Sequence, residues 1–316
     1  MPDHQLVSVV IPAREAAGTL GRALASVLAQ DYRPLEIIVV DDASRDETAA
    51  MAASFQEAAP HLRLIRLPRP LGAAGARNAG IAAACGEIIA FQDADDEWLP
   101  GKLSAQIALL RRAPQPVFVA CGCRLIAPDG RDLGPLYDGQ IPQAGPRAWP
   151  GLLARNTIAT PSVLAWRDAL LAVGGFDTTL PVGEDQDLWI RLALRGRLGY
   201  VDAALVRVHV TPGSLSGVGE ADGCRQQLAI TLPMVRRHVA AQRQALSRAE
   251  RRRILGERWG RLGRAAYGYR LYGEGLRLVL QATLLGFEPA RNLWFLLSAS
   301  PPARWLKRRL ALDRRG

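Results

Sequence analysis

The amino-terminal part of the chain alternates strongly apolar runs with helical stretches, and this alternation limits it to a layered α/β fold. Strand-like runs lie at residues 6–11, 35–40, 62–67 and 87–91, and helical stretches lie at residues 19–30, 46–57, 72–84 and 102–111. Runs that are apolar on both faces belong to sheets that helices cover on both sides. Strands that alternate with helices are joined by right-handed crossovers. We therefore expect an α/β fold with a mostly parallel sheet flanked by helices.

The pattern changes after residue 111 and changes again near residue 222. Residues 117–126 predict a strand, and the turn Pro128-Asp129-Gly130 that follows predicts a hairpin bend. Beyond Gly223 the chain is almost wholly helical, with predicted breaks at Pro233, near residues 273–275 and at residues 301–302. We therefore expect a sheet domain over residues 1–222 and a basic helical region over residues 223–316.

Charge is distributed unevenly along the chain. The formal net charge is +10, yet residues 225–316 contain 20 Lys and Arg against 5 Asp and Glu. The carboxyl-terminal region is therefore strongly basic, and the rest of the chain is mildly acidic. A nucleic-acid-binding protein combines basic charge with a recognisable binding motif, and this sequence has no such motif. We therefore exclude nucleic acid as a partner and expect different tasks for the two regions.

The sequence predicts a cytoplasmic location. Its first ten residues run directly into an apolar strand, without the basic and apolar regions of a secretory signal peptide. No stretch reaches the ~18 uninterrupted apolar residues of a spanning helix, and charged residues and a proline interrupt the best candidate, residues 276–300. The four cysteines lack metal-ligand spacing, which favours buried free thiols in a reducing compartment.

Acidic side chains directly follow two of the predicted strands. Asp42 follows one strand, and Asp93, Asp95 and Asp96 follow another. In open α/β sheets, ligands bind outside the carboxyl ends of the strands, so both acidic turns should line one crevice and form one acidic cluster. Carboxylates this close together repel one another, and a hard divalent cation such as Mg²⁺ or Mn²⁺ neutralises them through oxygen ligands. The alternative is a solvated acidic turn that caps the following helix.

Two further features should lie beside this crevice. Asp42 could accept hydrogen bonds from a pyrimidine base or a ribose, or it could cap a helix. The segment 71–80, LGAAGARNAG, allows close backbone approach and places Arg77 on a helix that begins next to the crevice. It is not a phosphate loop, because no Gly-Lys-Ser/Thr follows.

A second acidic cluster comes much later in the chain. Glu184, Asp185 and Asp187 precede an apolar helical periodicity, so they lie in the first turn of a helix, where unsatisfied amides favour anions. One of these carboxylates could point into the crevice as a general base, or all could serve only as helix caps. His209 lies on a predicted strand just before a turn and could be a ligand or a structural side chain.

Five of these segments together resemble the family 2 glycosyltransferases. They are VVIPARE, IIVVDDAS, GAAGARNAG, FQDADDEW and GEDQDLWIRL, in the order and approximate spacing of that family, over about residues 6–216. The resemblance implies the GT-A fold, which is Rossmann-like, and a mostly inverting transfer from a UDP-, GDP- or dTDP-sugar donor. It also implies a glycan or lipid-linked acceptor and an Mn²⁺ or Mg²⁺ cofactor.

The resemblance also implies roles for individual residues. Asp185, the second residue of the Glu-Asp pair, corresponds to the catalytic base, and Asp95 is the expected direct metal ligand. His209 matches a position that approaches the metal or the diphosphate in some relatives. The expected nucleotide-sugar contacts come from Pro12, Ala13, Glu15, Asp42, Arg77, Asp93, Asp95 and Glu184. Many relatives carry Tyr-Asn where this chain has Ala13-Arg14, which bears on base stacking and on the choice of nucleotide.

The basic helical region suggests a second kind of partner. It is rich in arginine and carries aromatic side chains at Trp259, Trp294 and Trp305. Such helices are suited to lying on an anionic membrane surface, and the alternative is a bundle that packs on the catalytic domain. We therefore expect a cytoplasmic enzyme that is peripheral on the inner face of the plasma membrane.

Other functions stay open at this point. A retaining transferase or a nucleotidyltransferase could be built on a similar sheet. A catalytically silent nucleotide-sugar-binding scaffold is the alternative from outside enzymology, and the presence of both Asp95 and Asp185 counts against it.

Overall fold

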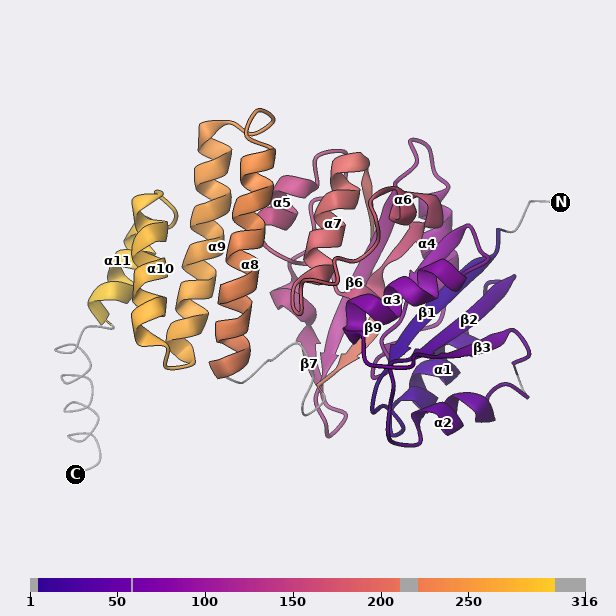
Figure 1. Cartoon of the computed structure of the whole chain (residues 1–316). Helices are drawn as coiled ribbons and strands as arrows, with labels where there is room; N and C mark the ends of the chain where they lie inside the picture. The colour runs from indigo at the N-terminus through magenta and orange to yellow at the C-terminus, as the bar shows by residue number, and fades with distance from the viewer. Residues whose placement is uncertain (1–4, 58, 211–220, 299–316) are drawn as a thin grey trace, which may run out of the picture. The chain divides into compact units, whose positions relative to one another are not determined.

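The computed structural model describes residues 5–57, 59–210 and 221–298 (Figure 1). The chain folds into two compact units, Met1–Leu152 with Asn156–Ser214 and Leu153–Arg155 with Leu215–Gly316. We call the first the sheet unit and the second the helical unit.

Within the described residues, nine strands form one sheet in the order β3-β2-β1-β4-β8-β6-β9-β5, with β7 paired to β6. The strands are β1 (Val7–Ala13), β2 (Leu35–Asp41), β3 (Leu62–Arg66), β4 (Ile88–Phe91), β5 (Glu97–Trp98), β6 (Phe118–Ile126), β7 (Asp132–Pro135), β8 (Leu164–Trp166) and β9 (Leu198–His209). β1 to β4 pair in parallel, as predicted. β8 runs antiparallel to β4 and β6, and β6 and β7 form the predicted hairpin. The sheet is therefore parallel in its amino-terminal half and mixed beyond it.

Helices cover both faces of this sheet, as the apolar runs predicted (Figure 1). The helices along this part of the chain are α1 (Leu20–Leu28), α2 (Thr48–Ser54), α3 (Gly72–Ala83), α4 (Lys102–Leu110), α5 (Trp149–Ala154), α6 (Arg167–Ala172) and α7 (Glu184–Arg195), with 3-10 helices η1 (Leu136–Gly139) and η2 (Thr160–Ser162). Successive β1 residues point to opposite faces. Val9 shares a core with Leu24 of α1, whereas Val10 packs against Gly80 of α3. α1 and α3 therefore lie on opposite faces of the sheet.

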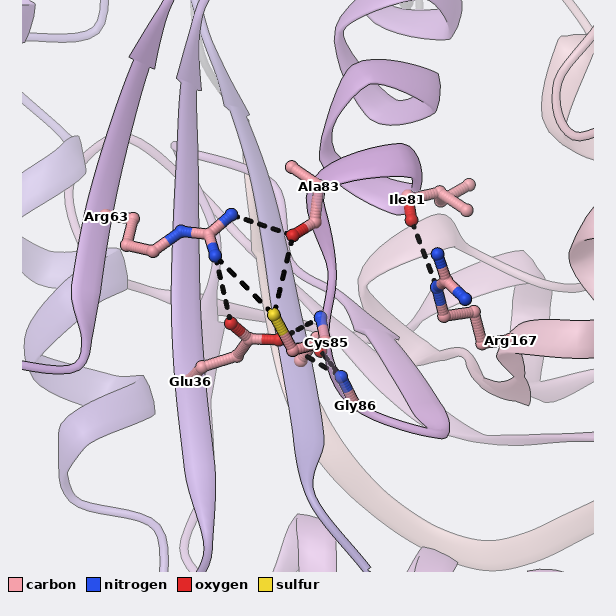
Figure 2. Close-up of polar contacts among 8 residues, drawn as sticks. Glu36, Arg63, Ile81, Ala83, Cys85, Gly86 and Arg167 are labelled. Atoms are coloured by element: carbon pink, nitrogen blue, oxygen red, sulfur yellow. Dashed lines mark hydrogen bonds and ion pairs between the residues drawn. The ribbon is translucent and has the colours of Figure 1, made fainter.

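A polar cluster lies at the amino ends of β2, β3 and β4 (Figure 2). Glu36, at the start of β2, accepts hydrogen bonds from the backbone amides of Cys85 (2.6 Å) and Gly86 (3.2 Å). Arg63 of β3 lies 3.7 Å from Glu36 and donates a 2.7 Å hydrogen bond to the carbonyl of Ala83. The cluster therefore holds the turn between α3 and β4, at the edge opposite the acidic strand ends. Cys85 is exposed here, contrary to prediction, whereas the other three free cysteines are buried.

The helical unit is built from α8 (Ala221–Ala241), α9 (Arg248–Gly268), α10 (Tyr272–Leu284) and α11 (Pro289–Ser298). The predicted break at Pro233 is wrong, because Pro233 lies inside α8. Proline removes one backbone hydrogen bond, and burial of the adjacent Met234 and Val235 offsets that loss. The predicted break near residues 273–275 falls in the first turn of α10, and the break at residues 301–302 lies outside the described residues. Over the ranges described, no helix has both the length and the apolar character needed to span a membrane.

Candidate active site

The acidic turns predicted to share a crevice lie at the same edge of the sheet. The parallel register places Ala13 beside Asp41 and Val10 beside Phe91, so β1, β2 and β4 end at that edge. The turns that follow β2 and β4 carry the first acidic cluster. Parallel strands with this register present their carboxyl-terminal turns to one ligand.

Asp42 is buried at the start of α3. Its two carboxylate oxygens accept hydrogen bonds from the backbone amides of Leu71 (2.6 Å) and Gly72 (2.9 Å). Asp42 therefore caps α3, a later helix than the one directly after β2. Each carboxylate oxygen has more than one lone pair, so these bonds leave acceptor capacity for a ligand. Arg14 lies 3.9 Å away, in the dipeptide that departs from the family pattern.

The loop after β1 is tied to the loop after β2. The Ala13 carbonyl accepts a 2.8 Å hydrogen bond from the amide that follows β2, and Glu15 Oε1 accepts one of 2.9 Å from the Arg45 amide. Glu15 and Ala43 have φ values of 49° and 56°, which are strained for residues other than glycine. Such strain clusters at functional sites, where surrounding contacts hold it. The loop from Pro12 to Glu15 is therefore held firmly at the acidic edge.

Arg77 of α3 joins the two acidic clusters. Its Nη2 donates a 2.8 Å hydrogen bond to Asp93 Oδ1, and its Nη1 donates one of 2.9 Å to Glu184 Oε1. Arg77 is buried, and its guanidinium lies 5.3 Å from the centroid of the Phe176 ring. Burial lowers the pKa of Arg77, but the charges of Asp93, Glu184 and Asp185 outweigh it and raise that pKa. One guanidinium therefore faces carboxylates from the turn after β4 and from the start of α7.

Asp185 lies in the first turn of α7, with a hydrogen bond on each carboxylate oxygen. Asn156 Nδ2 donates to Oδ2 over 2.9 Å, and the Gln186 amide donates to Oδ1 over 2.6 Å. Burial and the charge of Glu184 raise the pKa of Asp185 to about 6, against the opposing effects of these two hydrogen bonds and of Arg77. A carboxylate with this pKa is ionised at neutral pH and is a better proton acceptor than an ordinary aspartate.

The turn after β4 packs against the end of β9. Asp96 is buried and accepts a 3.0 Å hydrogen bond from the His209 backbone amide, and Arg22 donates one of 2.6 Å to the Asp95 carbonyl. Burial and the charges of Asp93 and Asp95 raise the pKa of Asp96 well above its ordinary value. The structure therefore brings the His209 backbone to the acidic turn, and the His209 imidazole Nε2 lies 3.6 Å from Glu97 Oε2. The metal-ligand role of His209 stays a prediction.

The acidic turn provides carboxylate oxygens for a cation without a complete protein coordination shell. Among residues 5–57, 59–210 and 221–298, no group of three His, Cys, Asp or Glu side chains is arranged to hold a metal. Mg²⁺ and Mn²⁺ are usually held by one or two carboxylates together with substrate phosphates. Burial is the largest cause of the raised pKa of Asp96, and the charges of Asp93 and Asp95 add a repulsion between carboxylates that a cation would relieve. The residues therefore fit a cation that is shared with a phosphate-bearing ligand.

Sequence reasoning missed two side chains of this site, Asn156 and Tyr137. Asn156 lies in an irregular segment before η2, where no periodicity or motif marks it. Tyr137 lies in η1 with a φ of 57°, and burial followed by the charge of Asp185 raises its pKa well above the ordinary value. Only the fold brings Asn156 into contact with Asp185 and Tyr137 within reach of its charge.

Sequence comparisons point to one family. The profile described as "Glycosyl transferase family 2" matches residues 8–149. The succinoglycan biosynthesis protein ExoO of Rhizobium meliloti (strain 1021) is 32% identical over 241 residues, which cover 73% of this chain and 68% of ExoO.

Two solved structures share the fold. S. aureus TarS 1–349 in complex with UDP aligns with a TM-score of 0.64 and 18% identity, over 95% of this chain and 91% of that one. The mannosyltransferase PcManGT from Pyrobaculum calidifontis, in complex with GDP-Man and Mn²⁺, aligns with a TM-score of 0.55 and 21% identity, over 95% of this chain and 82% of that one. With the family match, these alignments confirm the predicted GT-A fold.

Proposed function

The chain belongs to glycosyl transferase family 2 and is a glycosyltransferase, and we propose that it moves a hexosyl group from a nucleotide-sugar to a hydroxyl of a glycan or lipid-linked acceptor, with inversion. The observation that carries this proposal is the pair of hydrogen bonds from Arg77 to Asp93 and Glu184. These bonds join the acidic strand-end turn to the start of α7, so donor-binding and proton-accepting groups can act on one substrate. The name of ExoO, a succinoglycan biosynthesis protein, supports a polysaccharide as the acceptor class.

Asp185 is the proposed base. As the acceptor oxygen bonds to the anomeric carbon, its O–H bond breaks and the proton passes to the Asp185 carboxylate. The nucleoside diphosphate leaves with the electron pair of the anomeric bond. A positioned base contributes about 10² to 10⁴ in rate to such a step. The pKa of about 6 supports this role, because Asp185 is then mostly ionised at neutral pH.

The nucleotide-sugar donor is the proposed ligand of the strand-end residues, on the other side of the site from Asp185. Asp42 and the loop from Pro12 to Glu15 would meet the nucleoside, and Asp93 would lie near the ribose and the diphosphate. Asp95, with His209 nearby, would hold Mn²⁺ or Mg²⁺ together with the phosphates. Such a cation supplies positive charge where negative charge grows on the leaving diphosphate. UDP in TarS, and GDP-Man with Mn²⁺ in PcManGT, support this class of donor and cofactor.

The experiment that tests this proposal is a thermal-shift panel of UDP, GDP, dTDP and CMP, each with and without Mn²⁺. A ligand that binds only the folded state raises the melting temperature. We expect one nucleoside diphosphate to stabilise the protein in an Mn²⁺-dependent manner. The corresponding sugar nucleotides are then incubated with candidate acceptors, and nucleotide release and the anomeric configuration of the product are measured. Binding without any transfer, or a retained configuration, would contradict the proposed reaction.

The helical unit supports a proposed membrane contact. Large apolar side chains are exposed on α10 and α11, at Leu280, Leu284, Leu293, Trp294 and Leu297. The exposed Arg277 of α10 carries a charge that suits anionic lipid headgroups, and Arg291 of α11 is also exposed but pairs with Glu288 over 3.2 Å. The proposal therefore assigns the chemistry to residues 1–222 and the contact with the inner face of the plasma membrane, on the cytoplasmic side, to residues 223–316.

Vesicle sedimentation tests this contact. We expect the full chain to sediment with phosphatidylglycerol vesicles and to remain in solution with phosphatidylcholine vesicles. The double variant Leu280→Gln with Leu284→Gln should sediment less, because it removes exposed apolar surface without changing the charge. Equal binding of both proteins to both vesicle types would contradict the proposed contact.

A further inference from the structure

Asn156 forms a hydrogen bond that no sequence feature suggested. Its Nδ2 donates to Asp185 Oδ2 over 2.9 Å, and its Oδ1 accepts a 3.3 Å hydrogen bond from the Ile158 amide. An amide side chain has one accepting and one donating end, so the Ile158 bond directs the donating end toward the carboxylate. The orientation of Asn156 is therefore set by its own backbone segment.

Two hydrogen-bond donors from the described part of the chain reach the Asp185 carboxylate. The Gln186 amide donates to one oxygen, at the amino end of α7, and Asn156 is the side-chain donor on Oδ2. Hydrogen bonds to an ionised carboxylate favour its charged form. Loss of the Asn156 bond would therefore favour protonation and would also release one side of the carboxylate.

The charged groups around Asp185 shift its pKa in opposite directions. Glu184 of α7 disfavours the ionised form, and Arg77 of α3 favours it. Tyr137 of η1 lies within the electrostatic reach of this carboxylate, and burial followed by the charge of Asp185 raises the pKa of Tyr137 well above the ordinary value, so Tyr137 is neutral at physiological pH. The charges therefore oppose each other, and a single hydrogen bond can decide how much of Asp185 is ionised near neutral pH.

We infer that Asn156 is a positioning residue for the transfer reaction: its side-chain amide holds the Asp185 carboxylate in one orientation and in the ionised form that accepts the acceptor proton. The inference rests on the proposed function, because it assumes that Asp185 is the base. The hydrogen bond itself can be tested without any substrate.

The test is a ¹³C NMR titration of the aspartate carboxyl carbons in the full-length protein. Asp185→Asn identifies the Asp185 resonance, because that resonance disappears. In Asn156→Ala, we expect the titration midpoint of Asp185 to rise by about one pH unit, because a hydrogen bond to a charged group is lost. Asn156→Asp is nearly isosteric and replaces the donor with a second carboxylate. Because the two carboxylates repel each other, the second ionisation of the pair that this carboxylate forms with Asp185 should have a midpoint at a still higher pH.

A matched control separates this effect from a general loss of packing. Asn78 donates a 2.8 Å hydrogen bond to the Phe176 carbonyl and accepts one of 2.8 Å from the Phe176 amide, and neither partner is a carboxylate. Asn78→Ala should lower stability as Asn156→Ala does, with the Asp185 midpoint unchanged. An unchanged midpoint in both Asn156 variants would overturn the inference.

Activity then distinguishes this inference from the proposed function. With the donor found in the thermal-shift panel, the acidic limb of kcat/KM should move with the NMR midpoint in Asn156→Ala, and the donor KM should stay unchanged. An inactive Asp185→Asn together with an unshifted Asn156→Ala would refute the role of Asn156 and leave the base intact. Full activity of Asp185→Asn would instead refute the base, whatever the titration shows.

Discussion

Arg77 Nη1 donates a 2.9 Å hydrogen bond to Glu184 Oε1, across 107 positions of sequence. The bond joins the buried face of α3 to the first turn of α7, and the second terminal nitrogen of the same guanidinium holds Asp93. The two acidic clusters of the sequence therefore share the positive charge of the Arg77 guanidinium. Since a buried charge without a partner is unfavourable, Arg77 is the side chain whose loss should most disturb this arrangement.

Replacement of Arg77 by methionine should destabilise the protein. The change keeps much of the side-chain volume but leaves Asp93 and Glu184 facing each other without a positive partner. Removing one member of a buried ion pair costs about 3 to 5 kcal/mol, and we expect about 2 to 4 kcal/mol here because both carboxylates are partly exposed. Urea unfolding measures the change. The exposed Arg69→Met is the control, and an equally small effect of both variants would contradict the proposed importance of Arg77.

The stability of Asp185→Asn should rise relative to the unsubstituted protein as the pH increases from about 4 to neutral. The folded-state pKa of Asp185 is about 6, above its ordinary value of 3.8, so ionisation of this carboxyl destabilises the fold. The cost is absent below about pH 4, grows as the pH rises to 6, and is constant above that. We expect the variant to gain about 1 to 3 kcal/mol relative to the unsubstituted protein between about pH 4 and neutral pH, beside a pH-independent loss because asparagine can accept only one of the two hydrogen bonds that Asp185 accepts. Unfolding curves at several pH values measure it, and a pH-independent difference would count against the raised pKa.

The rate of transfer should fall as the medium becomes acidic. The proposed base acts in its ionised form, so kcat/KM should decline below about pH 6, approaching a tenfold loss per pH unit. The measurement is a pH profile of nucleotide release at saturating Mn²⁺. A rate that stays constant well below pH 6 would show that a group other than Asp185 accepts the proton.

Removal of the divalent cation should slow transfer strongly and reversibly. Chelation should lower the rate by about 10²-fold or more, and added Mn²⁺ should restore it, because the leaving diphosphate loses its compensating charge. Asp95→Asn should weaken Mn²⁺-dependent nucleotide binding in isothermal titration calorimetry. Asp129→Asn, in the exposed turn between β6 and β7, is the control with the same change of charge. Normal metal dependence in Asp95→Asn would remove this residue from the proposed metal site.

Gly80→Ala should destabilise the sheet unit. A Cβ at Gly80 would lie 2.3 Å from Val10 Cγ1, a distance that forces α3 away from β1. Overpacking of this kind costs about 1 to 3 kcal/mol, and Val10→Ala should recover part of the loss by making room. Thermal unfolding measures both effects. Gly18→Ala is the control, since no heavy atom lies within 4 Å of the added Cβ.

Much of the fold followed from local patterns in the sequence. The four apolar runs became the parallel strands β1 to β4, and the turn at residues 128–130 became the β6–β7 hairpin. Pro233 shows the limit of such patterns, because a local helix breaker lies inside α8 once its neighbours are buried in tertiary contacts. Cys85 shows another, since its exposure depends on where the turn after α3 reaches the surface.

The sequence by itself determined the α/β class, the edge of the sheet where the acidic turns lie, and the family. These features depend on periodicities and strand-end motifs, which are formed by residues close together in the sequence. Tertiary structure alone decided that Arg77 holds Asp93 and Glu184, and that Asn156 donates to Asp185. Contacts between residues this far apart depend on how α3 and α7 pack on the sheet. Such packing leaves no periodic signal in the sequence. The sequence could therefore indicate Asp185 as a base without identifying the Asn156 side-chain amide that donates to it.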